Sequence, residues 1–236
     1  MIYPEHIAIC MPSRGLIYSK VIEGVFDGIE VLHQEGYITS LFISNDLPIP
    51  DSHNACLKRA LEAGCDRIVF VEEDNYIGPT EFQALATTTA DVATLQYNDK
   101  NGSPHGIIHY NEANEILWCG LGATSIKRVV FESLEEPYFR TDTRYKITKK
   151  RLTEDKRLIT EYEEIEPRQV YNPETRKFEE KKDPYIYGGL DVDFFTRARK
   201  AGFKITKIPD MKSIHLKVVK MGEAYTNNGV HEITSV

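Results

Sequence analysis

The chain has 236 residues, enough for one α/β domain, and its 41% hydrophobic and 28% charged residues exclude a disordered or fibrous protein. A formal net charge of −7 argues against general binding along a nucleic-acid backbone. The four cysteines form no Cys-x-x-Cys pair, which favours buried, reduced thiols in a cytoplasmic protein. The sequence shows no secretory signal and no apolar run of about 18 residues, so no membrane span is predicted.

Strands and helices are predicted to alternate over the first 71 residues. The predicted order is a strand at His6–Cys10, a helix over Ile17–Glu35, a strand at 37–44, a helix from Asp51 or Ser52 to Ala63, and a strand at 67–71. This order is typical of a parallel sheet with right-handed crossovers. Ligands of such sheets bind beyond the carboxyl ends of the strands.

The remaining elements are less regularly spaced. Strands are expected in "DVATLQY", "GIIHY" and "EILWC", a Gly-rich turn and helix in "GLGATSIKRVVFESL", a helix in "LDVDFFTRARKAG", and closing strands in "FKITKIP" and "KSIHLKVV". Residues 140–184 are polar and charged, and we interpret them as an insertion on the rim of the site. Within them, "RQVYNPETRKFEEK" resembles a hairpin that turns at Asn172-Pro173.

Three acidic residues, Glu72, Glu73 and Asp74, follow the apolar strand 67–71 directly. Such a run is often only a solvated loop. Adjacent carboxylates repel one another unless a cation neutralises them, so this position at a strand end also predicts a divalent metal site. Oxygen ligands suit Mg²⁺ or Mn²⁺ better than Zn²⁺, and these ions keep positions open for substrate phosphates.

Several strings, in order along the chain, resemble the glycosyltransferases of the GT-A fold, in particular family 2 and related enzymes. "FVEEDN" resembles their Asp-x-Asp motif, "MPSRG" their first nucleotide-contacting loop, "GLGATSIKRVVFES" their acceptor-side turn, and "GGLDVDFFTRARKAGF" their "GEDVDF…RARKAG" motif. The resemblance fails only at 140–184. It implies a single Rossmann-like α/β domain over 1–236 with a mixed central sheet flanked by helices. About 1–100 would bind the nucleotide sugar, and 101–236 would form the acceptor side.

The resemblance implies metal-dependent transfer of a hexosyl or pentosyl group from a UDP- or GDP-linked sugar to an acceptor hydroxyl. It assigns Asp74, His215 and Glu72 to Mn²⁺ or Mg²⁺, and a mixed carboxylate and imidazole set favours Mn²⁺. Asp191 is the implied base, which implies inversion at the anomeric carbon, and Asp193 is the fallback. Two positions depart from the family pattern: Glu72 replaces the first Asp of the metal motif, and Leu190 replaces the acid before Asp191.

The resemblance also assigns residues to the two substrates. The residues expected to contact the donor are Pro12, Ser13, Arg14, Asp46, Asn54, Glu72, Glu73, Lys217 and Lys220. The residues expected on the acceptor side are Trp118, Gly120, Gly188 and Gly189. Arg14 suits phosphate because its guanidinium is a fork of donors, and Lys217 and Lys220 would close over the diphosphate.

The sequence leaves the acceptor open among a saccharide, a protein hydroxyl and a hydroxymethylated DNA base. Residues 140–157 carry eight Lys or Arg against three Asp or Glu, which suits either a phosphate-tracking patch or a solvated hairpin. Two other functions remain open: a sugar-phosphate nucleotidyltransferase and a non-catalytic nucleotide-sugar-binding protein. The first needs a Gly-rich phosphate loop, and "MPSRGL" has one glycine.

Overall fold

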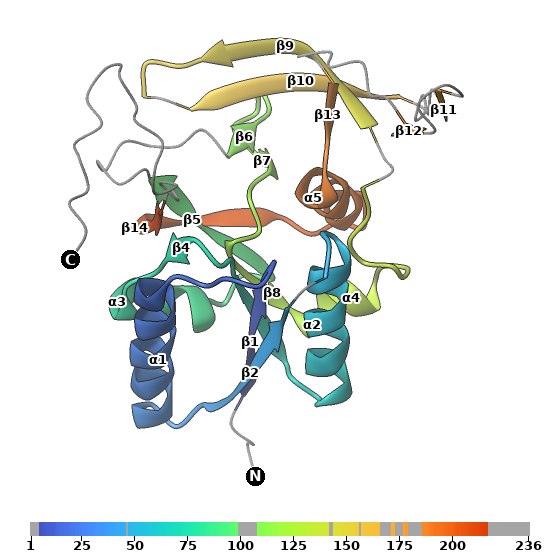
Figure 1. Cartoon of the computed structure of the whole chain (residues 1–236). Helices are drawn as coiled ribbons and strands as arrows, with labels where there is room; N and C mark the ends of the chain where they lie inside the picture. Colours follow the sequence, from blue (N-terminus) through green and yellow to red (C-terminus); the bar gives the residue numbers. More distant parts are fainter. Residues whose placement is uncertain are drawn as a thin grey trace, which may run out of the picture.

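The computed structural model describes residues 5–45, 47–98, 108–141, 144–155, 157–165, 171–172, 177–178 and 186–216. The described chain forms a seven-stranded sheet flanked by helices, a five-stranded sheet and a two-stranded ribbon (Figure 1). The predicted α/β class with a mixed central sheet is therefore confirmed. Among the described residues, no helix has both the length and the apolar character that crossing a membrane requires.

The larger sheet has the strand order β2-β1-β3-β8-β5-β14-β4. Its strands are β1 (His6–Pro12), β2 (Ile38–Ser44), β3 (Arg67–Val71), β4 (Asn75–Tyr76), β5 (Val92–Asn98), β8 (Ala123–Lys127) and β14 (Ile205–His215). β1 pairs in parallel with both β2 and β3, as the alternating pattern predicts. β8 lies antiparallel between β3 and β5, and this makes the sheet mixed.

Helices cover both faces of this sheet. They are α1 (Ser19–Gln34), α2 (Asp51–Glu62), α3 (Pro79–Ala86) and α4 (Arg128–Glu132), whereas α5 (Leu190–Lys200) packs against strands of the smaller sheet. In Figure 1, α1 and α3 lie on one side of the sheet, and α2 and α4 lie on the other. This arrangement explains the continuous apolar runs of β1 and β3, because a strand covered on both faces has no polar side. Successive residues Ile68 and Val69, for example, belong to different hydrophobic clusters.

Three sequence-based expectations about the large sheet were wrong. "ATSIK" is strand β8, whereas a turn and a helix were expected there, and only α4 of the predicted helix forms. The two closing strands are one strand, β14, with a register shift between Lys207 and Lys212. Helix α3 was not predicted, because its eight residues are too few to show a helical period clearly.

The smaller sheet has the order β13-β9-β10-β6-β7 and includes two strands from the expected insertion, β9 and β10. Its strands are β6 (His109–Tyr110), β7 (Ile116–Trp118), β9 (Arg144–Leu152), β10 (Leu158–Ile165) and β13 (Ile186–Gly188). β6 and β7 pair antiparallel as a hairpin. The separate ribbon pairs β11 (Tyr171–Asn172) with β12 (Lys177–Phe178), as the predicted polar hairpin requires, and its turn lies outside the described residues.

Candidate functional site

The three acidic side chains after β3 point to different partners. Glu73 turns toward the first loop, where its carboxylate accepts hydrogen bonds from the Ser13 hydroxyl (3.0 Å), the Arg14 backbone amide (2.8 Å) and Arg14 Nε (2.7 Å). Burial raises the pKa of Glu73, but the hydrogen bonds from Arg14 and Ser13 outweigh it and hold this pKa below its ordinary value. Glu73 therefore fixes the first loop, and the Arg14 guanidinium that was expected to meet phosphate is paired with it.

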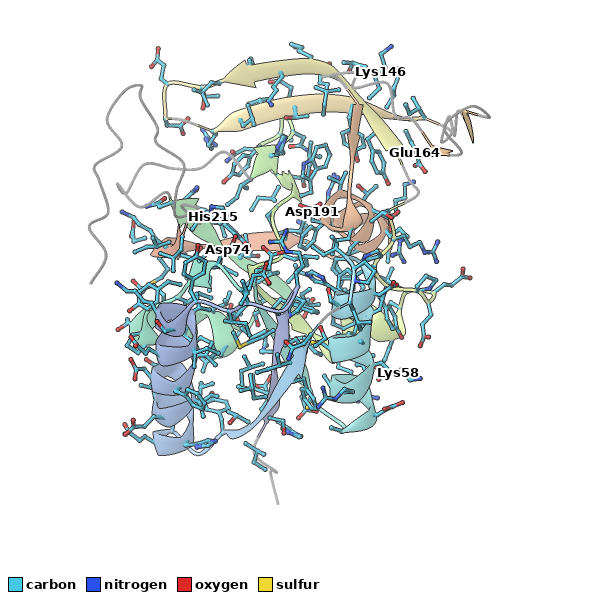
Figure 2. All side chains as sticks on the ribbon, in the orientation of Figure 1. Lys58, Asp74, Lys146, Glu164, Asp191 and His215 are labelled. Atoms are coloured by element: carbon cyan, nitrogen blue, oxygen red, sulfur yellow. The ribbon has the colours of Figure 1, made fainter. Side chains whose placement is uncertain are left out.

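Asp74 turns the other way and meets His215. The distance between Asp74 Oδ2 and His215 Nε2 is 3.2 Å. The backbone brings them together, because β14 pairs antiparallel with β4 and the Leu216 amide donates to the Asp74 carbonyl oxygen at 2.7 Å. Figure 2 shows both side chains side by side at the edge of the large sheet.

The surroundings of Asp74 are electrostatically unfavourable for its carboxylate. Burial raises the pKa of Asp74, His215 opposes this, and the neighbouring Glu72 and Glu73 add to it, so that the pKa lies above its ordinary value. A cation beside this carboxylate would relieve the repulsion.

Of the three predicted metal ligands, Asp74 and His215 lie together. Within the described ranges, no group of three or more His, Cys, Asp or Glu side chains is arranged to hold an ion. Glu72 Oε1 instead lies 3.7 Å from His53 Nε2. A two-donor set of one carboxylate oxygen and one imidazole nitrogen suits an ion whose other ligands are water and substrate phosphates.

Two cavities meet at Glu72. The first, which we call the Asp191 cavity, has a volume of about 290 Å³, and its lining residues are Glu72, Asn75, Tyr97, Gly120, Leu121, Leu190, Asp191 and His215. The second, which we call the loop cavity, has a volume of about 230 Å³, and its lining residues are Pro12, Ser13, Arg14, Ile49, Ser52, His53, Glu72, Glu73 and Asp74. The acidic turn thus separates two spaces, and Asp74 and His215 each line one of them.

Asp191 lies at the start of α5, labelled in Figure 2, and faces the first cavity. Burial raises the pKa of Asp191 to about 6, with a contribution from Glu72, while the hydrogen bond from the Val192 amide to Asp191 Oδ1 (2.9 Å) opposes it. A carboxylate with this pKa is a better proton acceptor than an ordinary one. Asp193, the fallback, is buried and accepts from Arg197 Nε at 2.8 Å, so its carboxylate is already paired.

Several other predicted residues have structural partners. The Asn54 side chain donates to the Phe139 carbonyl oxygen (2.9 Å) and accepts from the Phe139 amide (3.1 Å). Trp118 is only 2% exposed and packs against His109 and Tyr162, so its ring offers no surface for an acceptor to stack on. Gly120 does line the Asp191 cavity, and its carbonyl oxygen accepts from Thr124 Oγ1 at 2.9 Å.

The remaining predicted residues are only partly placed. Gly188 ends β13, and Gly189 precedes α5 with a φ of 154°. Asp46, Lys217 and Lys220 lie outside the described residues.

Sequence reasoning missed three residues that the structure places at the site. Asn75 and Tyr97 line the Asp191 cavity, and His53 lines the loop cavity. His53 is 1% exposed and packs between the rings of Phe70 and Phe139. Only Asn75 carried a usable signal, since it directly follows the acidic residues.

The fold and site together define an α/β protein with a mixed sheet, a carboxylate–imidazole pair at the sheet edge and two cavities beside it. No protein-family model matches the chain, and no curated protein matches its sequence.

Three solved structures are similar to the chain over most of its length. A197 from STIV aligns with a TM-score of 0.51 and 17% identity, over 91% of this chain and 86% of that one. The catalytic domain of Drosophila β1,4-galactosyltransferase 7 in complex with xylobiose aligns with a TM-score of 0.47 and 12% identity, over 88% and 66%. A mutant of the same Drosophila enzyme with manganese, UDP-Gal and xylobiose gives a TM-score of 0.45 and 13% identity, again over 88% and 66%. At these identities, the likeness to A197 concerns the fold alone.

Proposed function

We propose that this chain is a metal-dependent glycosyltransferase that moves a sugar from a nucleoside-diphosphate donor to an acceptor hydroxyl. One observation carries the proposal: Asp74 and His215, 141 residues apart in the sequence, lie 3.2 Å apart between two cavities that share Glu72. A donor has two parts, a nucleotide and a sugar, joined by a diphosphate. Two adjoining cavities with a metal-binding pair between them suit that shape.

The loop cavity suits the nucleotide end of the donor. Pro12 and Ser13 line it, and the hydrogen bonds from Ser13 and Arg14 to Glu73 hold this loop in place. A divalent cation held by Asp74 and His215 would act as a Lewis acid on the diphosphate when it is bound. Because the Arg14 guanidinium is paired with Glu73, a cation held by Asp74 and His215 would supply the positive charge beside the leaving group.

Asp191 is the base in this proposal. In a single displacement, the acceptor oxygen forms a bond to the anomeric carbon while the bond from that carbon to the diphosphate oxygen breaks. The acceptor proton passes to the Asp191 carboxylate, and the nucleoside diphosphate leaves with the electron pair. Attack from the side opposite the leaving group inverts the anomeric carbon. The raised pKa of Asp191 favours this proton transfer near neutral pH.

The acceptor belongs to one of the three classes that the sequence leaves open. The structure weakens the prediction that the basic residues of 140–157 bind a DNA acceptor. Several of the described basic side chains of the β9–β10 hairpin are paired with acidic side chains. Lys149 Nζ lies 2.8 Å from Glu161, Lys146 Nζ 3.6 Å from Glu163, and Arg151 Nη2 2.6 Å from Glu112. Figure 2 shows Lys146 on this hairpin, well away from Asp74 and His215. A saccharide or a protein hydroxyl fits the site better.

The test is a panel of nucleotide sugars incubated with the protein and Mn²⁺, with products identified by mass spectrometry. We expect one donor to be hydrolysed slowly to a nucleoside diphosphate and a free sugar, and chelation of the metal with EDTA to stop the reaction. UDP or GDP should raise the melting temperature only when Mn²⁺ is present.

Other outcomes identify the alternatives. Stabilisation by a nucleoside triphosphate and a sugar phosphate, with release of pyrophosphate, would indicate a nucleotidyltransferase. Donor binding without hydrolysis or transfer to any acceptor would indicate a binding protein. A melting temperature that responds to no nucleotide would reject all three.

A further inference from the structure

The most unusual side chain at the site is the amide of Asn75, in the short strand β4. Asn75 is fully buried, yet it lines the Asp191 cavity. In the part of the chain that the structure describes, neither Asn75 Nδ2 nor Asn75 Oδ1 has a hydrogen-bond partner. Its backbone is well held, because its amide donates to the Glu72 carbonyl oxygen (3.1 Å) and β4 pairs with β14.

A buried amide with no partner opposes folding, because it has lost its hydrogen bonds to water and gained none. Buried polar groups in native proteins are nearly always paired, and a group beside a cavity can be paired by what the cavity binds. An amide offers one acceptor and two N–H donors at nearly the same place. A hydroxyl group, which both donates and accepts, is the matching ligand chemistry.

Two of the other polar groups in this cavity are acceptors. The carboxylates of Glu72 and Asp191 accept hydrogen bonds, whereas the Tyr97 hydroxyl accepts from the Ala123 amide at 2.6 Å and keeps its O–H as a donor. Asn75 Nδ2 adds two N–H donors beside these acceptors. A ligand bearing several hydroxyls, some donating and some accepting, meets both kinds of group.

The size of the cavity and the glycine behind Asn75 both suit a ligand that bears several hydroxyl groups. About 290 Å³ lies at the lower end of the range for ligand pockets and suits one sugar ring. Behind the amide, a Cβ atom on Gly122 would lie 2.5 Å from Asn75 Nδ2 and from Glu72 Oε2. Only a glycine at this position leaves room for both side chains to lie against the β7–β8 turn.

We propose that Asn75 is a sugar-binding residue: its side-chain amide hydrogen-bonds hydroxyl groups of the transferred sugar inside the Asp191 cavity. This inference rests on the proposed glycosyltransferase function and adds to it the residue that holds the donor sugar. It separates the roles of the two cavities, because Asn75 lines the Asp191 cavity and is not among the residues that line the loop cavity, where the nucleotide is proposed to bind.

The experiment compares two affinities, measured by calorimetry with Mn²⁺, for the wild type and for Asn75→Ala and Asn75→Ser. The probes are the free nucleoside diphosphate, UDP or GDP, and the nucleotide sugar that the donor panel identifies. We expect the variants to bind the nucleotide sugar about tenfold more weakly and the free nucleoside diphosphate unchanged, as the loss of hydrogen bonds to one ligand group predicts. Asn98→Ala is the matched control, since Asn98 is buried with an unpaired Oδ1 and is not among the residues that line the cavity.

The outcomes separate this inference from the proposed function. If the wild type binds no nucleoside diphosphate, the proposed function fails and the role of Asn75 fails with it. If the wild type and both variants bind the nucleotide sugar equally well, only the Asn75 assignment is overturned. An equal loss of both affinities, or a loss matched by Asn98→Ala, would show that Asn75 is structural. Two different substitutions guard against a single misfolded variant, and melting temperatures check each protein.

Discussion

At the scale of single residues, neighbours in the sequence have separate tasks. Glu73 holds the first loop through Ser13 and Arg14, and Asp74 meets His215 on another strand. Glu72 lines both cavities. Three carboxylates in a row are therefore not one interchangeable acidic patch, and their substitutions should have different consequences.

Replacing Asp74 by Asn should remove the metal-dependent part of nucleotide binding. The amide keeps the shape of the side chain but loses the charge that attracts a divalent cation. We expect the rise in melting temperature with UDP or GDP and Mn²⁺ to disappear, while the protein without ligand unfolds at an unchanged or slightly higher temperature.

Asp91→Asn is the control for this change, because Asp91 is an exposed carboxylate paired with Lys127 (2.9 Å) and lines neither cavity. A nucleotide response that survives in Asp74→Asn as strongly as in Asp91→Asn would remove Asp74 from the metal site.

Replacing Asp191 by Asn should abolish transfer and yet stabilise the protein at high pH. The pKa of Asp191 is about 6 in the folded chain and near its ordinary value of 3.8 in the unfolded one, so the folded state binds the proton more tightly. The stabilisation from this proton is complete below about pH 4 and is lost as the pH rises through 6. At pH 8, without metal, the asparagine variant should therefore be more stable by about 3 kcal/mol, with little difference at pH 4.

Urea unfolding at the two pH values measures this, with Asp193→Asn as the comparison. Asp193 is paired with Arg197, so its substitution should destabilise the protein by about 3 kcal/mol at pH 8. An Asp191→Asn variant that is less stable than the wild type at pH 8, or that retains full transfer activity, would contradict the assignment.

At the scale of elements, the turn between β7 and β8 shapes the site through the absence of a side chain. Gly122 accepts a hydrogen bond at its carbonyl from the Glu72 amide (3.2 Å) and leaves space for the side chains of Glu72 and Asn75. The sequence places a Gly-rich turn here, but it does not show which glycine is indispensable or what lies against it.

Gly122→Ala should lower stability and donor turnover together. Its Cβ would lie 2.5 Å from two polar side-chain atoms, so both must move, at a cost of about 1–3 kcal/mol. Urea unfolding and donor hydrolysis measure the two effects.

Gly36→Ala is the control that separates a loss of stability from a loss of donor turnover. Gly36 ends α1 with a φ of 89° and has open space around it, so alanine there should cost about 1 kcal/mol through strain alone and leave turnover intact. Normal turnover in Gly122→Ala at a temperature where it is fully folded would show that the turn does not shape the site.

At the scale of the whole molecule, a buried ion pair and the candidate site lie at opposite ends of β3. The acidic residues follow its carboxyl end, whereas Arg67 at its start is 2% exposed and pairs with Glu5 (3.0 Å) and the Ser125 hydroxyl (3.2 Å). Such a division is typical of α/β sheets, in which binding sites lie beyond the carboxyl ends.

Arg67→Ala should therefore destabilise the protein without changing nucleotide affinity. It leaves Glu5 without its buried partner, and we expect a loss of about 3 kcal/mol in the free energy of unfolding. Calorimetry with UDP or GDP and Mn²⁺, well below the melting temperature, should give the wild-type affinity. A large loss of affinity in the folded variant would show that the two ends are coupled.

Much of this molecule follows from local sequence signals. The apolar runs of β1, β2 and β3 and the helical periods of α1, α2 and α5 are strong, so their type and order could be predicted. Because parallel strands end at one edge, the same pattern predicted a binding site at Glu72 to Asp74, and in the structure these residues line two cavities. The glycosyltransferase resemblance added Asp191 and His215 as candidates, and the structure places both beside the Asp191 cavity.

Only the tertiary structure decided which polar groups pair and which stay free. Arg14, Asn54 and Trp118 have the right chemistry for substrate contacts, but Glu73, the Phe139 backbone and the aromatic core engage them. Asn75 has an ordinary local sequence, and it stands out only because folding buries its amide beside a cavity with no partner. The physical reason is the same in both cases. The sequence determines the chemical type of a side chain, whereas its hydrogen-bond partners come from residues that only the fold brings near.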